Sequence, residues 1–470
     1  MSEDTPTRVS ADAPSSRGMR VFFWSLTAAL AGFLFGFDTV VISGAEQTIQ
    51  RLWGLSAGLH GLAMGSALYG TVLGALIGGW PADRLGRRPT LLAVGILYFV
   101  SAVWSALATG VYSFSLARFI GGLGVGIATV AAPMYIAEIS PPARRGRLAG
   151  MFQFNIVFGI LAAFLSNALI GWWGGESAWR WMLGVEAVPA LLYTMLCLGI
   201  PESPRWLLVR RGDRQRALAV LRWVEPEGGA EQWKARVEEI LAASAAPGRK
   251  ERFWSRRLAR PILLAFLIAM FNQLSGINAV LYFAPRIFEW TGLARQAALL
   301  QSVGIGLTNL IFTLVGLWLI DRAGRRTLLY LGSVGYILSL GMVALGFVTG
   351  RYEWVPPFIF LFIAAHAVGQ GAVIWVFIAE IFPNRQRAEG QALGSFTHWF
   401  FAALLTSVFP RMAESLPPAG IFGFFCLMMI LQLLWVKWMV PETKGVPLEE
   451  IQKRLGSVRE TPSPGGLGDA

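Results

Sequence analysis

Charged residues are scarce in this chain. Only 14% of its 470 residues are Asp, Glu, Lys or Arg, whereas a soluble globular protein carries about 25%. Hydrophobic residues make up 55%, and the mean hydropathy is +0.54. A single soluble core does not absorb such an excess, because cores stop growing beyond about 250–300 residues. The shortage of charge therefore excludes an ordinary soluble protein and predicts one that contacts the lipid bilayer.

Cysteine and histidine are also rare. The two cysteines, Cys197 and Cys426, lie within apolar runs and are expected to be packing residues rather than a disulfide or metal ligands. The chain has three histidines, no HExxH motif and no phosphate-binding loop. We therefore expect a protein that is not an enzyme and that holds no metal and no cofactor.

Basic residues outnumber acidic ones, with a net charge of +12 and a pI near 10.2. Such a balance can indicate nucleic-acid binding, but the positions of the cations indicate otherwise. Twelve apolar runs are long enough for transmembrane helices, which need about 20 residues. If the N-terminus is inside, 33 of the 40 basic residues fall in inside segments and 6 in outside loops, as the positive-inside rule demands. We therefore expect a multi-pass protein of the cell membrane, with both termini cytoplasmic and no nucleic-acid partner.

These runs begin near Val21, Gly61, Thr90, Tyr112, Gly150, Trp181, Pro261, Leu299, Thr327, Pro357, Gln391 and Ile421.

The two halves of the chain repeat each other. GGWPADRLGRRP (Gly78 to Pro89) is echoed by LIDRAGRRTL (Leu319 to Leu328), and AEISPPARRGRLAG by AEIFPNRQRAEGQA, at offsets of 238 and 242 residues. Paired six-helix halves with a site between them are a transporter architecture. The predicted fold is an all-α membrane protein of twelve transmembrane helices in two six-helix halves. Its expected parts are a disordered tail 1–20, a first half 21–200, a cytoplasmic helical linker 201–260, a second half 261–440 and a cytoplasmic tail 441–470.

Seven motifs resemble those of the sugar porter family of the major facilitator superfamily. They are GFLFGFDTVVISGA, GGWPADRLGRR, RFIGGLGVGIATVAAPMYIAEIS, PESPRWLL, NQLSGINAVLYFAP, DRAGRR and PETKG. The resemblance extends from Val21 to Lys453. It implies the major facilitator fold and a carrier that moves a monosaccharide by alternating access and functions as a monomer.

Three ionisable residues lie within spans of the first half: Asp38, Arg118 and Glu186. Charges inside a bilayer are costly, so each marks a candidate functional site. A lone Asp can also anchor a helix pair, but three charges of both signs suggest an exchange network. By the resemblance, they fall where proton-coupled members carry an Asp with its neighbouring Arg and Glu. Facilitative glucose carriers have Asn at the place of Asp38, so a proton is the implied coupling ion.

A sugar pocket needs amides for the hydroxyls and aromatic rings for the apolar faces. The resemblance implies sugar contacts for Gln153, Gln273 and Asn278, while Gly276 allows a helix break between amides. Polar residues in spans can also join helices without touching substrate. Ala372 stands where the family often has Pro, which puts a second helix break in doubt, and Ile160 replaces a glutamine of the xylose symporter, which favours a hexose such as glucose over a pentose such as xylose. The full candidate set is Phe35, Gln153, Asn272, Gln273, Asn278, Tyr282, Asn309, Trp375, His398 and Trp399.

Charged residues at the cytoplasmic ends of the spans are expected to form gating ion pairs. Glu138 is expected to pair with the cations around Arg144, and Glu380 with Arg385 or Arg387. By the resemblance, such pairs hold the outward-facing state and break on inward opening. The candidates are Asp83, Arg84, Arg88, Glu138, Arg144, Asp321, Arg322, Arg326, Glu380 and Arg387.

Two alternatives remain open on the same fold. A facilitative uniporter would carry the sugar without a proton, although it would not need a titratable group at Asp38. A sugar-sensing receptor would bind without transporting, but such receptors usually add a long cytoplasmic tail, and only about 30 residues follow Pro441.

Overall fold

The computed structural model describes residues 14–141, 145–173, 175–225, 229–245, 252–383 and 385–455, and every regular element within these ranges is a helix. Twelve of the helical segments there are long and apolar enough to cross a membrane. Each starts at the expected residue or up to six residues before it. The predicted all-α fold of twelve transmembrane helices is confirmed.

The first half is a bundle of long helices joined by short ones. Its long helices are α1 (Pro14–Val41), α3 (Ala57–Ile77), α5 (Arg87–Leu107), α6 (Val111–Ile139) and α7 (Arg145–Trp173), followed by the divided pair α8 (Ala178–Gly184) and α9 (Ala187–Leu198). Short helices α2 (Glu46–Leu52) and α4 (Gly79–Arg84) lie at its two ends. The linker contributes α10 (Pro204–Trp206), a π-helical turn Leu207–Arg211, α11 (Arg214–Val224) and α12 (Ala230–Ala245).

The second half repeats this arrangement with more interruptions. Its seventh span is divided into α13 (Ala259–Leu274) and α14 (Ile277–Tyr282), with α15 (Ala284–Glu289) after it. Then follow α16 (Arg295–Ala323), α17 (Arg325–Thr349), α18 (Val355–His366), the π-helical turn η7 (Ala367–Gly371) and α19 (Ala372–Ile381). The last elements are α20 (Arg387–Ser415), α21 (Pro418–Met439) and α22 (Leu448–Arg454).

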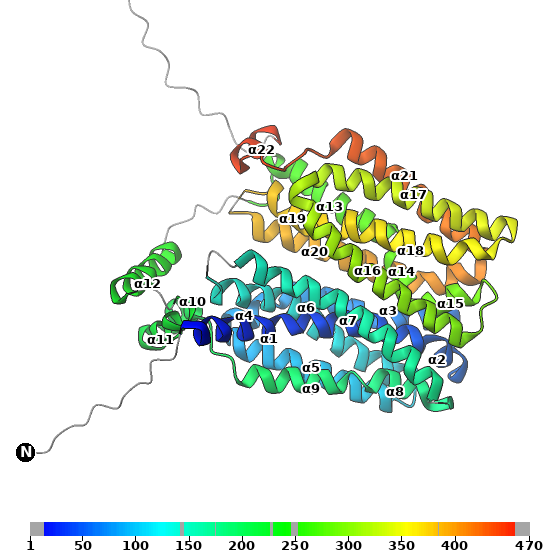
Figure 1. Ribbon diagram of the computed structural model, residues 1–470, viewed down its shortest axis with the longest axis horizontal. Helices are drawn as coiled ribbons and strands as arrows, with labels where there is room; N and C mark the ends of the chain where they lie inside the picture. The colour runs from blue at the N-terminus through cyan, green and yellow to red at the C-terminus, as the bar shows by residue number, and fades with distance from the viewer. Residues whose placement is uncertain are drawn as a thin grey trace, which may run out of the picture.

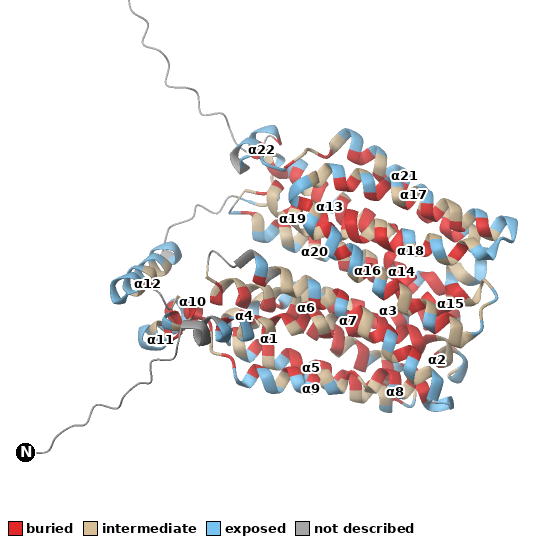
Figure 2. Cartoon of the chain, in the orientation of Figure 1, coloured by how far each residue is buried: buried red, intermediate tan, exposed pale blue. Residues whose placement is uncertain are grey.

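The two halves lie side by side with their long helices roughly parallel (Figure 1). One end of the molecule carries α11, α12 and α22, and we call it the linker end. The other end carries α2 and α15, and we call it the latch end (Figure 1). Buried residues concentrate between the helices, whereas the outer faces are exposed (Figure 2). Large apolar side chains on those exposed faces, such as Leu76, Leu191, Leu307 and Leu434, suit contact with lipid.

The halves contact each other through α3 against α20 and α7 against α16. Glycine makes the first contact possible, since a Cβ on Gly61 of α3 would lie 1.8 Å from the carbonyl oxygen of Ser407 on α20. The Ser407 hydroxyl also donates to the hydroxyl of Tyr69 at 3.1 Å. Both contacts lie toward the latch end of the bundle.

One expected boundary is different in the structure. Helix α1 begins at Pro14, inside the stretch expected to be a disordered tail. The reason is packing: Val21 is buried in an apolar cluster with Trp206 and Leu221 of the linker, which gives the start of α1 a partner. The tail after residue 440 contains α22, which packs against α19. The remaining parts of the expected disordered tails, 1–13 and 456–470, lie outside the described residues.

Candidate functional site

A buried ion pair links two helices of the first half. Asp38 lies near the end of α1 and Arg118 lies on α6, and both side chains are only 2% exposed. The Arg118 guanidinium donates from Nη1 to the Asp38 carboxylate and from Nη2 to the Asp38 backbone oxygen at 2.9 Å. Buried charges survive when each is paired and hydrogen-bonded. The structure therefore joins the Asp and Arg that the sequence singled out.

Glu186 lies beside this pair, and one of its two carboxyl oxygens has no hydrogen-bond partner. It occupies the turn between α8 and α9, is 1% exposed, and its Oε1 atom makes no hydrogen bond. It interacts electrostatically with both Asp38 and Arg118. The three predicted charges thus form one buried group, in which one cation faces two carboxylates.

Two hydroxyl groups complete this buried group and were not found from the sequence. The hydroxyls of Tyr98 and Ser101 on α5 are buried and lack hydrogen-bond partners. Gly121 on α6 makes room for them, because a Cβ there would lie 2.4 Å from the Ser101 hydroxyl and 3.7 Å from the Asp38 carboxylate. Hydroxyls on apolar spans are common, so no sequence signal distinguished these two.

The second half contains a chain of side-chain amides. Asn278 donates to the Gln273 amide oxygen at 2.7 Å, and Gln273 donates to the Asn272 oxygen at 2.9 Å. The Gln273 nitrogen also lies 3.1 Å from a ring nitrogen of His398. Four of the predicted sugar contacts are therefore brought together, from α13, α14 and α20.

The amide chain continues into residues that the sequence reasoning missed. Asn272 lies 3.5 Å from the Gln370 oxygen, Gln370 donates to Gln432 at 2.9 Å, and Gln432 donates to the Ser333 hydroxyl at 2.8 Å. Gln370 and Gln432 are fully buried. A signal for them was available, since each is an amide within an otherwise apolar span.

Aromatic rings border the amides and connect the two halves. The His398 ring contacts Trp375 at 5.3 Å between centroids and Trp399 at 4.7 Å. Trp399 in turn meets Phe35 of the first half edge to face at 5.4 Å. Tyr282 is buried in the second half and interacts electrostatically with Asp38 and Arg118. The aromatic and amide groups thus lie where the halves meet, next to the buried ion pair.

Two further candidates are less closely connected to this group. Gln153 is half-buried on α7, and Asn309 on α16 accepts a hydrogen bond from its neighbour Thr313 at 3.4 Å. Within the described residues, no hydrogen bond joins either of them to the amide chain. Their assignment to the sugar site remains a prediction.

Both helix breaks occur next to the amide chain. Gly276 has φ +88°, in the left-handed region that favours glycine, and it separates α13 from α14 as predicted. The second break is the π-helical turn η7, which forms although Ala372 replaces the usual proline. Here Gly369 and Gly332 approach so closely that a Cβ on Gly369 would lie 2.8 Å from the Cα of Gly332. Close backbone packing therefore accompanies the break where proline is absent.

Each half carries a network of charges at the linker end. In the first half, Arg87 donates to both carboxylate oxygens of Glu138 at 2.9 Å and pairs with Asp83 at 3.2 Å. The carboxylate of Glu202 accepts from the backbone amide of Arg87 at 3.0 Å. Burial raises the pKa of Glu202, although the amides of Ser203, Arg87 and Arg88 oppose this by donating to the charged form.

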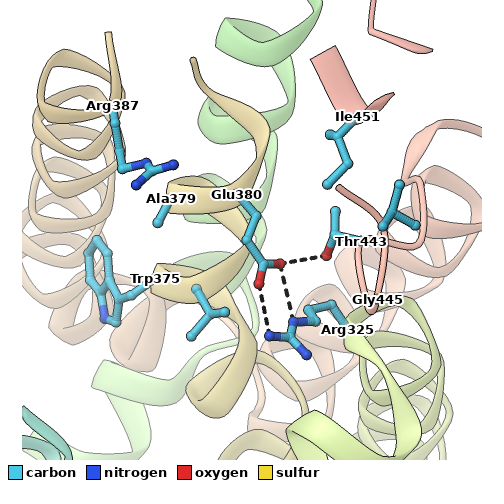
Figure 3. A pocket seen from close by; sticks show the side chains of 10 residues that line it. Arg325, Trp375, Ala379, Glu380, Arg387, Thr443, Gly445 and Ile451 are labelled. Carbon is cyan, nitrogen blue, oxygen red and sulfur yellow. Dashed lines mark hydrogen bonds and ion pairs between the residues drawn. The ribbon is translucent and has the colours of Figure 1, made fainter. Parts of the chain in front are cut away.

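The second half builds the same network from the repeated motif. Arg325 donates to Glu380 at 2.8 and 3.1 Å and pairs with Asp321 at 3.2 Å. The Thr443 hydroxyl donates to Glu380 at 2.6 Å. Figure 3 shows these contacts at the wall of a cavity of about 560 Å³, with the Arg387 side chain on its far side. The networks therefore repeat in geometry as well as in sequence.

The arginines that form these pairs differ from those expected. Arg87 and Arg325 each begin a helix after a glycine with positive φ, Gly86 and Gly324. This turn directs them inward toward the Glu, whereas Arg84 and Arg322 are exposed and Arg88 and Arg326 are half-buried. Arg84 and Arg322 lie over tryptophan rings, and Arg88 and Arg326 donate to backbone oxygens.

The expected pairing of Glu380 with Arg385 or Arg387 is absent from the described conformation, and it stays a prediction for the outward-facing state. Within the described residues, Arg387 makes no ion pair, and Glu380 is taken by Arg325 of its own half. Glu138 likewise pairs inside its own half. Arg144 lies outside the described residues.

Charged contacts between the halves occur at the latch end. Glu46 of α2 accepts two hydrogen bonds from Arg286 of α15, at 2.9 and 2.6 Å. Arg295 at the start of α16 donates to the Gly44 backbone oxygen at 3.0 Å and to the Thr48 hydroxyl at 2.9 Å. Sequence reasoning missed these residues, because they lie in short helices and are paired across more than 230 positions. The hydrogen bonds that Arg286 and Arg295 make between the halves lie toward this end and hold the latch end closed.

Two six-helix halves, closed on each other at one end, with a buried charge group in one and a chain of amides bordered by aromatic rings in the other, define a carrier of the alternating-access class. A family model described as "Sugar (and other) transporter" matches residues 24–455. The arabinose–proton symporter of Bacillus subtilis is 33% identical over 461 residues, covering 96% of this chain and 99% of that one. The D-xylose–proton symporter of Escherichia coli is 34% identical, covering 92% and 95%.

Solved structures agree with these sequence matches. The inward open conformation of the xylose transporter XylE from Escherichia coli superposes with a TM-score of 0.82 and 32% identity, covering 92% of this chain and 99% of that one. The chain belongs to the sugar porter family of the major facilitator superfamily, and it is a multi-pass membrane protein.

Proposed function

We propose that this protein imports a monosaccharide together with a proton by alternating access. The observation that carries the proposal is the Asp38–Arg118 pair, buried in the first half and adjacent to Tyr282 of the second. A carrier without a coupling ion has no use for an ionisable pair kept from water at such cost. Relatives named as arabinose–proton and xylose–proton symporters support the same function.

The buried group suggests how a proton controls the carrier. When Asp38 takes a proton, it no longer neutralises Arg118, and the guanidinium turns to Glu186, whose Oε1 atom is free to accept a hydrogen bond. The loaded carrier then lacks the Asp38–Arg118 ion pair, and its two halves rock into the other orientation. Release of the proton restores the Asp38–Arg118 pair and returns the empty carrier. Each proton moving down 100 mV contributes about 2.3 kcal/mol, enough for roughly fifty-fold accumulation of one sugar.

The sugar is expected to bind between the amide chain and the aromatic rings. Gln273 and Asn278 offer hydrogen bonds to hydroxyls, while Trp375 and Trp399 cover the apolar faces of the ring. A hexose such as glucose is favoured, because apolar Ile160 stands where the resemblance places a glutamine in the xylose symporter. The linker end is assigned to the cytoplasm, since it carries most of the basic residues. The described conformation then faces inward.

The test is uptake in proteoliposomes under an imposed pH gradient, with wild type beside Asp38→Asn. Asparagine mimics the protonated carboxyl, so the variant should bind sugar and exchange it downhill but lose accumulation against a gradient. Asp213→Asn is the matched control, because Asp213 caps an exposed linker helix and asparagine caps a helix equally well. Continued accumulation by Asp38→Asn would remove Asp38 from the coupling role. If wild type itself ignores the proton gradient, the facilitative alternative is correct.

A further inference from the structure

Glu46 is a carboxylate buried between the two halves at the latch end. Its side chain is fully buried and forms a two-pronged pair with Arg286. Arg286 also donates to the Gln50 amide oxygen at 2.7 Å. Because Glu46 belongs to the first half and Arg286 to the second, this pair exists only while the latch end is closed.

A histidine lies on the other side of the same carboxylate. His60 on α3 is fully buried, and its Nε2 atom is 3.2 Å from Glu46 Oε2. Neither ring nitrogen makes a well-directed hydrogen bond, and the ring meets Phe283 of the second half edge-on at 6.2 Å. Unlike Arg286, His60 belongs to the same half as Glu46 and stays beside it when the halves part.

The charge balance of the closed latch disfavours a second cation. Burial opposes ionisation of Glu46, but the charge and hydrogen bonds of Arg286, together with the neighbouring His60, hold its pKa below the ordinary value. Glu46 therefore stays ionised at physiological pH and is already neutralised by Arg286. A protonated His60 would add an uncompensated charge to this buried site. Histidine is the side chain that normally changes charge between pH 5 and 8.

The other charged groups around the latch do not alter this balance. Arg51 of α2, Glu289 of α15 and Arg295 of α16 line or border the shallow polar hollow above it. On α20, which packs against α3, Arg411 and Glu414 are exposed. Two further anions and three further cations therefore lie around the site, so its surroundings hold no large excess of either charge.

We propose that His60 is a second proton-binding residue of this carrier, which takes up a proton as the latch end opens and replaces Arg286 as the partner of Glu46. In the open state Glu46 loses Arg286 and is exposed to water, where a protonated His60 beside it is favourable. The proton therefore stabilises the open latch, and deprotonation stabilises the closed one. Acid on the latch side holds the empty carrier open on that side. The proposal does not depend on which side of the membrane the latch end faces. Calling that side external rests on the orientation given under the proposed function.

The experiment measures the latch directly, without sugar or a proton gradient. In a chain with Cys197→Ala, Cys426→Ala and Asp38→Asn, spin labels at Tyr112→Cys and Ser415→Cys report the distance between the halves at the latch end. The Asp38→Asn change removes the buried carboxylate of the coupling site as a source of pH dependence. Between pH 8 and pH 5 the ratio of open to closed carriers should rise roughly tenfold, within the usual range of coupling free energies.

Three variants of this chain separate the residues. His60→Gln keeps a hydrogen-bonding side chain that does not titrate, and it should remove the pH dependence. Arg286→Gln should be mostly open at every pH. His366→Gln is the matched control, a half-buried histidine elsewhere in the second half, and it should keep the full response.

The outcomes are unambiguous for the proposal. A distance that ignores pH in the parent, or a pH response that survives His60→Gln, overturns it. Loss of the response in His60→Gln but not in His366→Gln supports it. The readout uses neither sugar nor a proton gradient. A negative result here therefore rejects the role of His60 without bearing on Asp38 as the coupling residue.

Discussion

Asp38 and Glu46 are buried carboxylates that lie close together in the sequence, and each pairs with an arginine. The difference is where the partner resides. Arg118 moves with Asp38, because both belong to the first half, so that pair depends on protonation rather than on the position of the halves. Arg286 belongs to the opposite half, so its pair with Glu46 depends directly on closure. In the proposed cycle, Asp38 responds to the proton, and Glu46 responds to closure of the latch end.

Gln273 is the residue whose loss should most affect sugar binding. It is the branch point of the amide chain, contacting Asn272, Asn278 and His398. Gln273→Ala leaves a sugar hydroxyl unpaired, which costs about 1–3 kcal/mol, or roughly ten- to hundred-fold in affinity. Equilibrium binding of labelled hexose to purified protein measures this loss. Gln215→Ala, which removes an exposed amide from linker helix α11, should bind as wild type does; equal affinities for both variants would exclude Gln273 from the pocket.

The residues that could be predicted from the sequence are those whose chemistry is out of place. Asp38, Arg118 and Glu186 stand out because a charge in an apolar span is costly. Arg87 does not stand out from Arg84 and Arg88, because three nearby arginines have the same chemistry and only the turn at Gly86 aims one of them inward. Glu46 and Arg286 lie outside the spans, where charge is ordinary, and their partnership follows only from the packing of the halves.

At the scale of elements, breaks in helices concentrate around the amide chain. A continuous helix satisfies its own backbone and is the stable form in lipid, so an interruption requires a local reason. At Gly276 the reason is a residue that tolerates positive φ. At η7 it is the close approach of Gly369 to Gly332. These interruptions give the second half freedom to adjust around a ligand where the first half has mostly straight spans.

Gly276→Ala tests the first break. Alanine at φ +88° costs roughly 1–2 kcal/mol, and its Cβ would lie 2.6 Å from the Phe425 ring. The variant should therefore unfold at a temperature lower by roughly a few degrees, and it should bind sugar more weakly because Gln273 and Asn278 flank the break. Thermal unfolding in detergent, with and without sugar, measures both effects.

Gly423→Ala is the control for that experiment. Gly423 lies within α21, and a Cβ there meets nothing within 4 Å. Alanine should leave the unfolding temperature unchanged or raise it slightly, because it is the better helix former. A Gly276→Ala protein as stable as the Gly423→Ala protein would show that the break does not depend on glycine.

The spans themselves were predictable because length and hydropathy determine them. The start of α1 was not, since the polar residues before Val21 form a helix only because the linker packs against it. The break at Gly276 followed from a local property of glycine. The break at η7 persists without proline through a tertiary contact between two glycines distant in sequence, which no local pattern contains.

For the whole molecule, closure at the latch end depends on one position that has no side chain. In Gly61→Val, the added atoms would collide with the Ser407 backbone oxygen 1.8 Å from the Cβ, so the latch end cannot close. The protein should abandon the described conformation for the one parted at the latch end, and transport should cease. Gly58→Val changes the same helix three residues earlier, where a Cβ meets nothing within 4 Å, and should transport normally.

Thiol labelling in intact cells reads out this change. A cysteine at Ser407 should react faster with an impermeant reagent added outside in Gly61→Val than in Gly58→Val. A cysteine at Ser244 on linker helix α12 should stay unlabelled in both, because the linker end is assigned to the cytoplasm. Labelling of Ser244→Cys from outside would show that the assigned orientation is wrong. Equal labelling of the Ser407 cysteine in both variants would show that Gly61 does not control closure.

The duplicated arginine networks at the linker end have a consequence for the direction of transport. Each half satisfies its own Arg, Asp and Glu, so parting the halves there leaves few charges without partners. These networks therefore do not themselves favour either state of the linker end. If the chain is the proton-coupled sugar carrier proposed above, sugar moves in whichever direction the combined gradients favour. A cell that loses its proton gradient while full of sugar would lose that sugar through the same protein that collected it.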